Sequence, residues 1–211
     1  INPENINLLT DSNASMIPTH NIISKWLPSR IEPNITNVII FFAGHGLATS
    51  NGDEMFLLAH DSFTDMLEES ALSRNHLFKK ISSFKPKSVT IFFDACYSGS
   101  TRDGETLLAD ARPVGILVKD NLNIPKNFTI FSASQMDQIS LGYKDAQHGL
   151  FSYYLMKGLE GEADSNKDKR ITNGELIVYL DEKVSQKALQ LNRKQNPSLS
   201  GNLDQVLIIF R

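Results

Sequence analysis

The sequence predicts an α/β fold in which a mostly parallel β-sheet is flanked by helices. Three observations lead to this fold class. Short runs rich in Ile, Val and Phe recur along the chain, and segments with the apolar spacing of amphipathic helices lie between them. The 211 residues, 41% of them hydrophobic, also suffice for one domain that buries a core without disulfides. Strands that alternate with helices are typical of parallel sheets covered on both faces.

Five segments are predicted as strands because they are short, strongly apolar and bounded by polar or turn-forming residues. They are residues 6–9, 38–42, 89–93, 128–131 and 206–210. Continuous apolar runs, in contrast to alternating ones, are typical of strands that are buried on both faces.

Four segments are predicted as helices because their apolar residues recur three or four positions apart. They are residues 17–26, 72–84, 151–159 and 176–184. Ser73 is a suitable N-cap for the second of these helices, which must end before Pro86. Gly161 ends the third. Residues 100–127 contain several Gly and Pro residues and form the long connection of the fold, the kind of segment that carries function or is cut by proteases.

The charge pattern excludes several classes of function. The chain has 21 basic and 24 acidic residues, a formal net charge of −3, and no basic block, so nucleic acid is not an expected partner. No apolar run approaches the roughly 18 residues that span a bilayer, and the N-terminal residues do not resemble a secretory signal. We therefore expect no membrane partner and a cytoplasmic location.

The chain has a single cysteine, which excludes internal disulfides and Cys-rich zinc sites. This residue, Cys96, follows the apolar run 89–93, and His45 follows the run 38–42. If these two strands are parallel neighbours, both residues emerge at the same edge of the sheet. A thiol beside an imidazole is the minimal apparatus for acyl transfer, because the imidazole accepts the thiol proton and the thiolate attacks a carbonyl carbon.

Each residue alone has an ordinary structural explanation, since a lone Cys is often a small buried hydrophobe and a lone His a satisfied polar residue. Their placement at two matching strand ends favours catalysis. The glycines around His45 agree with this interpretation. Gly44 and Gly46 permit a sharp turn, and the backbone N–H groups of Gly46 and Cys96 are candidates for an oxyanion hole.

These residues resemble the caspase-like cysteine peptidases, most closely the metacaspase and bacterial caspase-like (orthocaspase) branch. The resemblance rests on Gly44-His45-Gly46 after one apolar strand and on Asp94-Ala95-Cys96-Tyr97-Ser98-Gly99 after the next. Further similar motifs follow in family order: Phe131-Ser132-Ala133-Ser134, Asp137-Gln138, His148-Gly149-Leu150-Phe151-Ser152 and Gln195-Asn196-Pro197. Together they cover nearly the whole chain.

The resemblance implies a caspase-like three-layer sandwich that occupies residues 1–211 as one peptidase domain. Its large-subunit-like part is about 1–100, its linker about 100–127 and its small-subunit-like part about 128–211. Family members begin with a further strand and helix, so we expect an upstream segment or a regulatory chain as a partner. A strand of this chain at 6–9 that paired directly with 38–42 would contradict that expectation.

The resemblance also implies a substrate pocket. In true caspases a Gln stands where this chain has Asp94, and metacaspase-like enzymes carry an acidic residue there that lines the pocket for the residue before the scissile bond. A carboxylate in such a pocket selects Arg or Lys. Asp137 resembles a second pocket carboxylate, with a solvated loop residue as its alternative. Ser132 and Ser134 are further candidates for contact with the peptide.

A twelve-residue segment, 164–175, matches a calcium-binding loop at five positions, Asp164, Asn166, Asp168, Thr172 and Glu175. Position 6 is Lys169 where such loops normally have Gly, and three basic residues balance the three carboxylates. The alternative is a polar turn that caps the following helix. The Cys-His chemistry requires no cofactor, and calcium is a candidate only through this loop.

The sequence thus predicts a cysteine endopeptidase that cleaves proteins or peptides after exposed Arg or Lys residues. A pocket for basic residues would also permit autocleavage in the long connection, at Arg112 or Lys119. The alternatives are a catalytically idle caspase-like module that binds a partner, and a calcium-responsive interaction domain.

Overall fold

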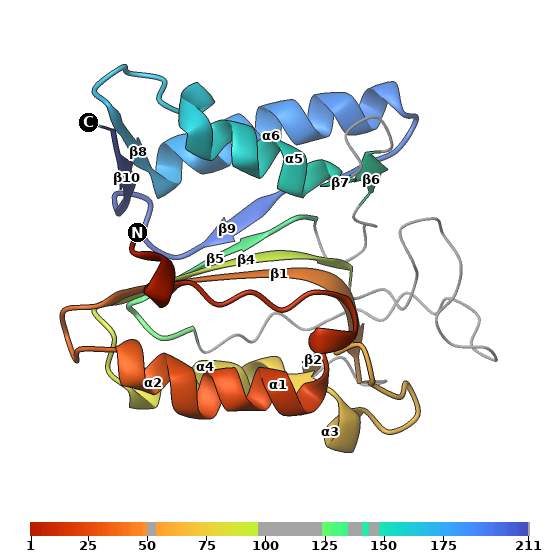
Figure 1. Ribbon diagram of the computed structural model, residues 1–211. Helices are drawn as coiled ribbons and strands as arrows, with labels where there is room; N and C mark the ends of the chain where they lie inside the picture. The colour runs from red at the N-terminus through yellow and green to blue at the C-terminus, as the bar shows by residue number, and fades with distance from the viewer. Residues whose placement is uncertain (50–53, 97–123, 135–140, 144–147, 211) are drawn as a thin grey trace.

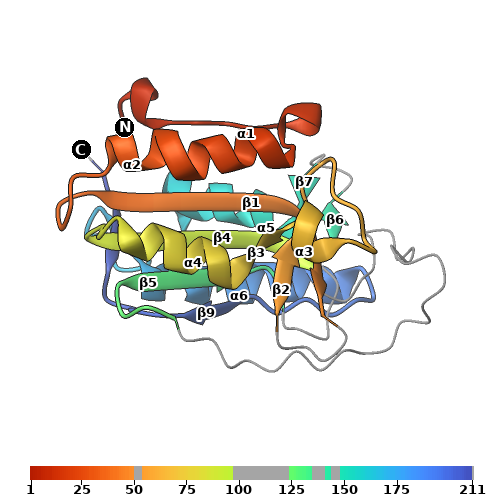
Figure 2. The ribbon, with the colours of Figure 1, turned by 90° about the horizontal axis from the view of Figure 1, so that it is seen from below.

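The computed structural model describes residues 1–49, 54–96, 124–134, 141–143 and 148–210 of the chain, with Cys96 described by its backbone. A six-stranded sheet in the order β3-β2-β1-β4-β5-β9 forms its centre. Figure 2 shows β1, β4, β5 and β9 side by side. The strands are β1 (Asn37–Ala48), β2 (Met55–Leu57), β3 (Leu72–Ser73), β4 (Ser88–Cys96), β5 (Phe128–Ser132) and β9 (Ser198–Ser200).

The two longest pairings, β1 with β4 and β4 with β5, are parallel, whereas the three short pairings toward the edges are antiparallel. Helices cover both faces (Figure 1). One layer holds α1 (Met16–Asn21), η3 (Ile22–Trp26), α2 (Leu27–Arg30) and α4 (Arg74–Ser83), and the other holds α5 (Leu150–Lys157), η5 (Gly158–Glu162) and α6 (Asn173–Gln190). The predicted sandwich of a mostly parallel sheet between two helical layers is confirmed.

The remaining elements are short. They are η1 (Pro3–Asn5), η2 (Asp11–Asn13), α3 (Leu67–Ser70), β6 (Gly142–Tyr143), β7 (His148–Gly149), β8 (Arg170–Thr172) and β10 (Val206–Ile209). All four predicted helices are present. The N-cap of α4 is also confirmed, because the Ser73 hydroxyl accepts a hydrogen bond from the His76 N–H at 3.1 Å.

The central strand β4 contributes to the two hydrophobic cores, one under each helical layer. Val89, Ile91 and Phe93 belong to the core beneath η3, α2 and α4, whereas Phe92 belongs to the core beneath α5 and α6. This alternation explains why the sequence of β4 is apolar without interruption. It also places Asp94, two residues after Phe92, on the face of the sheet that α5 and α6 cover.

One strand prediction is wrong, and another predicted strand lies outside the main sheet. Residues 6–9 form no strand, and Ile6 and Leu8 are 59% and 79% exposed, because an apolar run becomes a strand only where a partner strand pairs with it. The segment predicted at 206–210 forms β10, but it is not a buried strand of the main sheet. It pairs antiparallel with β8 in a separate two-stranded sheet and is partly exposed.

One edge of β1 pairs with little of the described chain. Apart from β4, the only described strand that pairs with β1 is β2, and it does so at Gly46, Leu47 and Ala48. Ile39 and Phe41, which precede this stretch, are 54% and 52% exposed. No register pair joins β1 to residues 6–9 in the described chain. The expected upstream strand and helix therefore stay a prediction.

Gly201, directly after β9, is a position where we expect substitution to be costly. Its φ is +139°, and an added Cβ would lie 2.7 Å from both the Phe128 carbonyl oxygen and the Thr129 Cα. We expect Gly201→Ala to lower the free energy of unfolding by roughly 2–5 kcal/mol, the sum of backbone strain and overpacking. Urea denaturation measures this change.

Gly142→Ala is the matched control for Gly201→Ala. An added Cβ at Gly142 would meet no atom within 4 Å. Equal urea midpoints for the two variants would contradict the assigned backbone geometry at Gly201.

Candidate functional site

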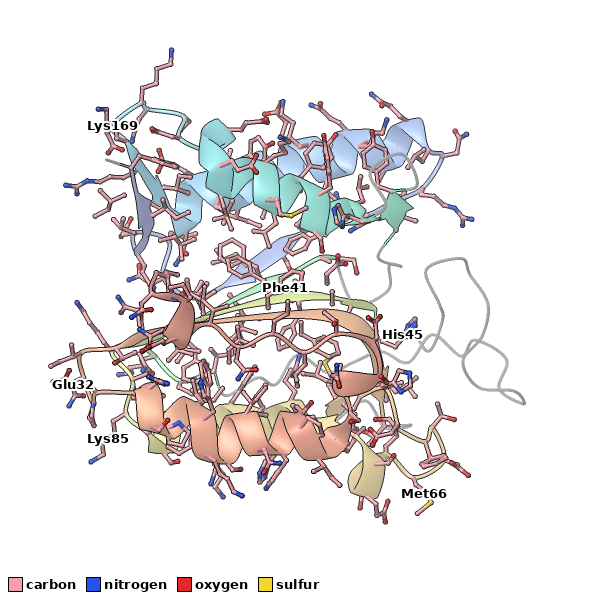
Figure 3. All side chains as sticks on the ribbon, viewed as in Figure 1. Glu32, Phe41, His45, Met66, Lys85 and Lys169 are labelled. Carbon is pink, nitrogen blue, oxygen red and sulfur yellow. The ribbon has the colours of Figure 1, made fainter. Side chains whose placement is uncertain are left out.

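The ends of β1 and β4 bring His45 and Cys96 together. The two strands run parallel in unbroken register from Asn37 opposite Ser88 to His45 opposite Cys96, which is the last pair. Neighbouring strands are about 4.8 Å apart, so the two backbones lie next to each other at the carboxyl edge of the sheet. Figure 3 shows His45 at this end of β1. The predicted neighbourhood of these strand ends is therefore present.

Local packing holds His45 in place. The His45 carbonyl accepts a hydrogen bond from the Leu58 N–H at 2.9 Å, which ties this point of β1 to the chain that follows β2. Just before it, an added Cβ at Gly44 would lie 3.0 Å from the tip of the Phe42 ring. Glycine at this position thus lets Phe42 fold against the backbone beside the half-buried His45.

Backbone pairing directs the Gly46 N–H toward the β4 side of β1. In an antiparallel pair, every second residue exchanges hydrogen bonds with the partner strand. The His45 carbonyl accepts from the Leu58 N–H, and the Thr49 N–H donates to the Glu54 carbonyl at 2.9 Å, so the odd-numbered residues bond toward β2. The Gly46 N–H points to the opposite side, toward β4, as expected for a residue of a strand that pairs with β4. Its role as an oxyanion donor stays a prediction.

Asp94 is fully buried, with 0% of its surface exposed, two residues before Cys96 on β4. The Ser152 hydroxyl donates a hydrogen bond to its Oδ2 atom. Ser152 belongs to the first turn of α5, whose N-terminal end carries a partial positive charge that stabilises a nearby carboxylate. A buried carboxylate is costly unless it is hydrogen-bonded, and this environment meets that need.

The other predicted pocket residues fall into two groups. Ser132 ends β5 and pairs in register with Phe93, and the buried Ser134 follows two residues later, so both lie at the same carboxyl edge as Asp94. Asp137, together with the predicted cleavage sites Arg112 and Lys119, lies outside the described residues.

Sequence reasoning missed two polar residues beside this edge. Ser152 contacts Asp94 across 58 positions of sequence. Gln195 is 1% exposed, and its side chain bonds the backbone at Ala133 and Leu141. Both residues lay within motifs noted above, Gln195 in Gln195-Asn196-Pro197 and Ser152 at the end of the motif that begins at His148, but neither was given a role there.

The polar groups of the candidate calcium loop form hydrogen bonds with one another. The Asp164 carboxylate accepts the N–H groups of Asp168 and Lys169, and the Asn166 side chain also accepts the Asp168 N–H. The backbone at Lys167 and Lys169 is left-handed, with φ of 59° and 65°. These contacts form the polar turn that the sequence allows as an alternative.

The end of the same loop caps α6. Thr172 and Glu175 form a reciprocal capping box, in which each side chain accepts the backbone N–H of the other. The Thr172 N–H, with hydroxyl donors nearby, lowers the pKa of the Glu175 carboxyl below its ordinary value. Within the described residues, no three or more His, Cys, Asp or Glu side chains gather in a way that could hold a metal ion.

Comparison with known proteins identifies similar sequences and folds. A family model described as the caspase domain matches residues 21–208 of the chain. A comparison with curated protein sequences gives no match. No helix of the described residues is long and apolar enough to cross a membrane.

Two solved structures have a similar fold. Protein GSU0716 from Geobacter sulfurreducens is 14% identical with a TM-score of 0.57, and the match covers 94% of this chain and 80% of that one. Caspase-1 from Spodoptera frugiperda is 17% identical with a TM-score of 0.51, over 82% of this chain and 63% of that one. At these identities the likeness shows the fold alone, a caspase-like sandwich.

Proposed function

This chain belongs to the caspase domain family, and from that premise we propose that it is a cysteine endopeptidase that cleaves after Arg or Lys. The observation that carries the proposal is the register pair His45–Cys96 at the carboxyl edge of the sheet, with the buried Asp94 two residues away. The acidic residue at position 94 favours the metacaspase-like branch of the family.

In the proposed reaction, His45 accepts the proton of the Cys96 thiol, and the thiolate attacks the carbonyl carbon of the scissile bond. The N–H groups of Gly46 and Cys96 donate to the resulting oxyanion. His45 then gives its proton to the departing amine, which leaves an acyl-enzyme. Water, activated by His45, hydrolyses the thioester and frees the thiol. The proposed chemistry uses side-chain and backbone groups of the chain together with water, and it needs no cofactor.

Asp94 supplies the proposed specificity. Its carboxylate would pair with the guanidinium of Arg or the ammonium of Lys in the residue before the scissile bond, and it would repel Asp or Glu. Asp137, Ser132 and Ser134 complete the proposed pocket. The proposed location is the cytoplasm, where a free catalytic thiol stays reduced.

A fluorogenic peptide panel tests this function. Peptides that end in Arg, Lys or Asp before the fluorophore are incubated with the wild-type protein, with and without calcium. We expect release from the Arg and Lys peptides only, without a requirement for calcium. Preference for the Asp peptide would refute the pocket assignment, and no turnover of any peptide would favour the idle binding module.

We further propose that the protein cuts itself between β4 and β5, at Arg112 or Lys119. The purified wild type is then expected to run as two fragments on a denaturing gel, whereas Cys96→Ala runs as one intact chain. Replacement of both Arg112 and Lys119 by Ala should also leave the chain intact. This variant still contains Cys96 and should still hydrolyse the peptides. Fragments in both wild type and Cys96→Ala, or in neither, would contradict autocleavage.

A further inference from the structure

Two buried polar side chains near Asp94, those of Gln195 and Ser152, have no part in the proposed chemistry. Both take part in one series of hydrogen bonds that starts at Phe93 and returns to Asp94, the next residue of β4. Every residue of this series is at most 9% exposed. Hydrogen bonds in such a low-dielectric interior are stronger than in water, and a missing one costs more.

The first half of the series runs through Gln195. The Ala133 N–H donates to the Phe93 carbonyl at 2.8 Å, which continues the pairing of β5 with β4. The Gln195 side chain then donates to the Ala133 carbonyl at 3.0 Å and accepts the Leu141 N–H at 2.9 Å. This single amide thus fixes Leu141 relative to the end of β5.

The second half runs through α5. The Leu150 N–H, at the first residue of the helix, donates to the Leu141 carbonyl at 2.8 Å. Two residues later, still in the first turn, the Ser152 hydroxyl donates to Asp94 Oδ2. The first turn of α5 is therefore held against the sheet by backbone bonds. The Ser152 hydroxyl connects this turn to the Asp94 carboxylate.

We propose that Ser152 is a positioning residue that sets the orientation of the Asp94 carboxylate for a basic substrate side chain; this inference rests on the proposed function. The terminal torsion of an Asp side chain is broad, so an unanchored carboxylate can rotate. The hydrogen bond from Ser152 to Oδ2 restricts this rotation.

The orientation of the Asp94 carboxylate matters more for the binding of Arg than for the binding of Lys. A guanidinium is planar and recognises a carboxylate through directed, often paired, hydrogen bonds, whereas an ammonium acts as a point charge that tolerates rotation of its partner. Ser152 should therefore raise the preference for Arg over Lys. A residue that merely stabilised the fold would affect both substrates equally.

The test compares Ser152→Ala, Ser152→Thr and Ser152→Val in the full chain, with Arg and Lys peptides. Thr and Val have the same shape and differ in the hydroxyl. A hydrogen bond to a charged group is worth about 1.5–3 kcal/mol, so we expect kcat/KM for the Arg peptide to fall about 10- to 100-fold in Ala and Val, mainly through KM. The Lys peptide should lose clearly less. Ser152→Thr should keep the wild-type ratio of Arg to Lys cleavage.

Two controls separate positioning from a general structural defect. Ser83→Ala removes a hydroxyl that donates to the Lys80 carbonyl within α4, on the other face of the sheet, and it touches neither Asp94 nor the series, so both kinetic constants should stay at wild-type values. Alkylation of Cys96 by iodoacetamide, an uncharged reagent that needs no substrate pocket, should proceed at the wild-type rate in every variant.

An unchanged Arg-to-Lys ratio in Ser152→Ala and Ser152→Val overturns the inference, and so does an equal loss for both peptides with slower alkylation. If Ser152→Ala fails to fold, the difference between the Thr and Val variants decides. If the wild type cleaves neither peptide, the proposed function itself is refuted. If the wild type cleaves both peptides and the Ser152 variants keep its Arg-to-Lys ratio, only the role of Ser152 is refuted.

Discussion

Cys96→Ala is expected to lower kcat/KM for Arg peptides by about 10⁴-fold or more, because it removes the only thiol of the chain. His45→Ala should cost about 10²- to 10⁴-fold, the usual contribution of a general base. The double variant should lose hardly more than Cys96→Ala, since the two residues act as a unit.

Initial rates with the fluorogenic Arg peptide measure these losses. His76→Ala is the matched control, because His76 is exposed on α4, which covers the face of the sheet opposite to Asp94, and its removal should leave kcat/KM unchanged. Thiol labelling gives a second readout. With one cysteine in the chain, loss of activity should follow incorporation of the label one to one. Full activity in a completely labelled protein would refute Cys96 as the nucleophile.

Asp94→Asn is expected to have the second largest effect, and it should act on specificity rather than on the thiol. Removing one partner of a desolvated charge pair costs about 2–5 kcal/mol, so kcat/KM for Arg and Lys peptides should fall by roughly 30- to several thousandfold. The amide is nearly isosteric and can still accept the Ser152 hydroxyl. Asp94→Asn should therefore still fold, and its thermal unfolding can be compared with that of the wild type.

The contrast with Asp181→Asn isolates the role of charge at position 94. Asp181 is exposed on α6, where it accepts a hydrogen bond from Ser185, and its neutralisation should change neither substrate preference nor rate. Alkylation of Cys96 should be as fast in Asp94→Asn as in the wild type. If Asp94→Asn kept its kcat/KM for Arg peptides, the basic residue would have to be recognised elsewhere.

The strands that build the site were predictable from sequence because they are buried on both faces. Val89, Ile91 and Phe93 face one core and Phe92 the other, so β4 is apolar throughout, and the polar residues that follow it stand out. The same reasoning failed for residues 6–9, whose apolar character is as clear but whose pairing depends on a neighbour. The edge strands β2, β3 and β9 have two or three residues each, too few for a sequence pattern.

The polar contacts around Asp94 could not have been predicted in the same way. Ser152 and Gln195 reach their partners across 58 and 62 positions of sequence, and only the packing of α5 and α6 on the sheet brings them there. The capping box of Thr172 and Glu175, by contrast, spans three positions and uses the residue types of a familiar helix start. Its residues also match a calcium loop, so the sequence left two interpretations open.

The pairing of β4 with β5 has a consequence for the covalent state of the protein. Residues 97–127 connect these two strands in sequence, yet β4 and β5 are bound directly through five register pairs, and the Phe92 and Phe131 rings stack at 4.9 Å. A cut between them would leave two polypeptides that share one sheet and both hydrophobic cores. Neither could bury its apolar strand alone, so they would form an obligate heterodimer. Asp94 and Cys96 would belong to one subunit and Ser152 to the other, and by mass action dilution would weaken the assembled site.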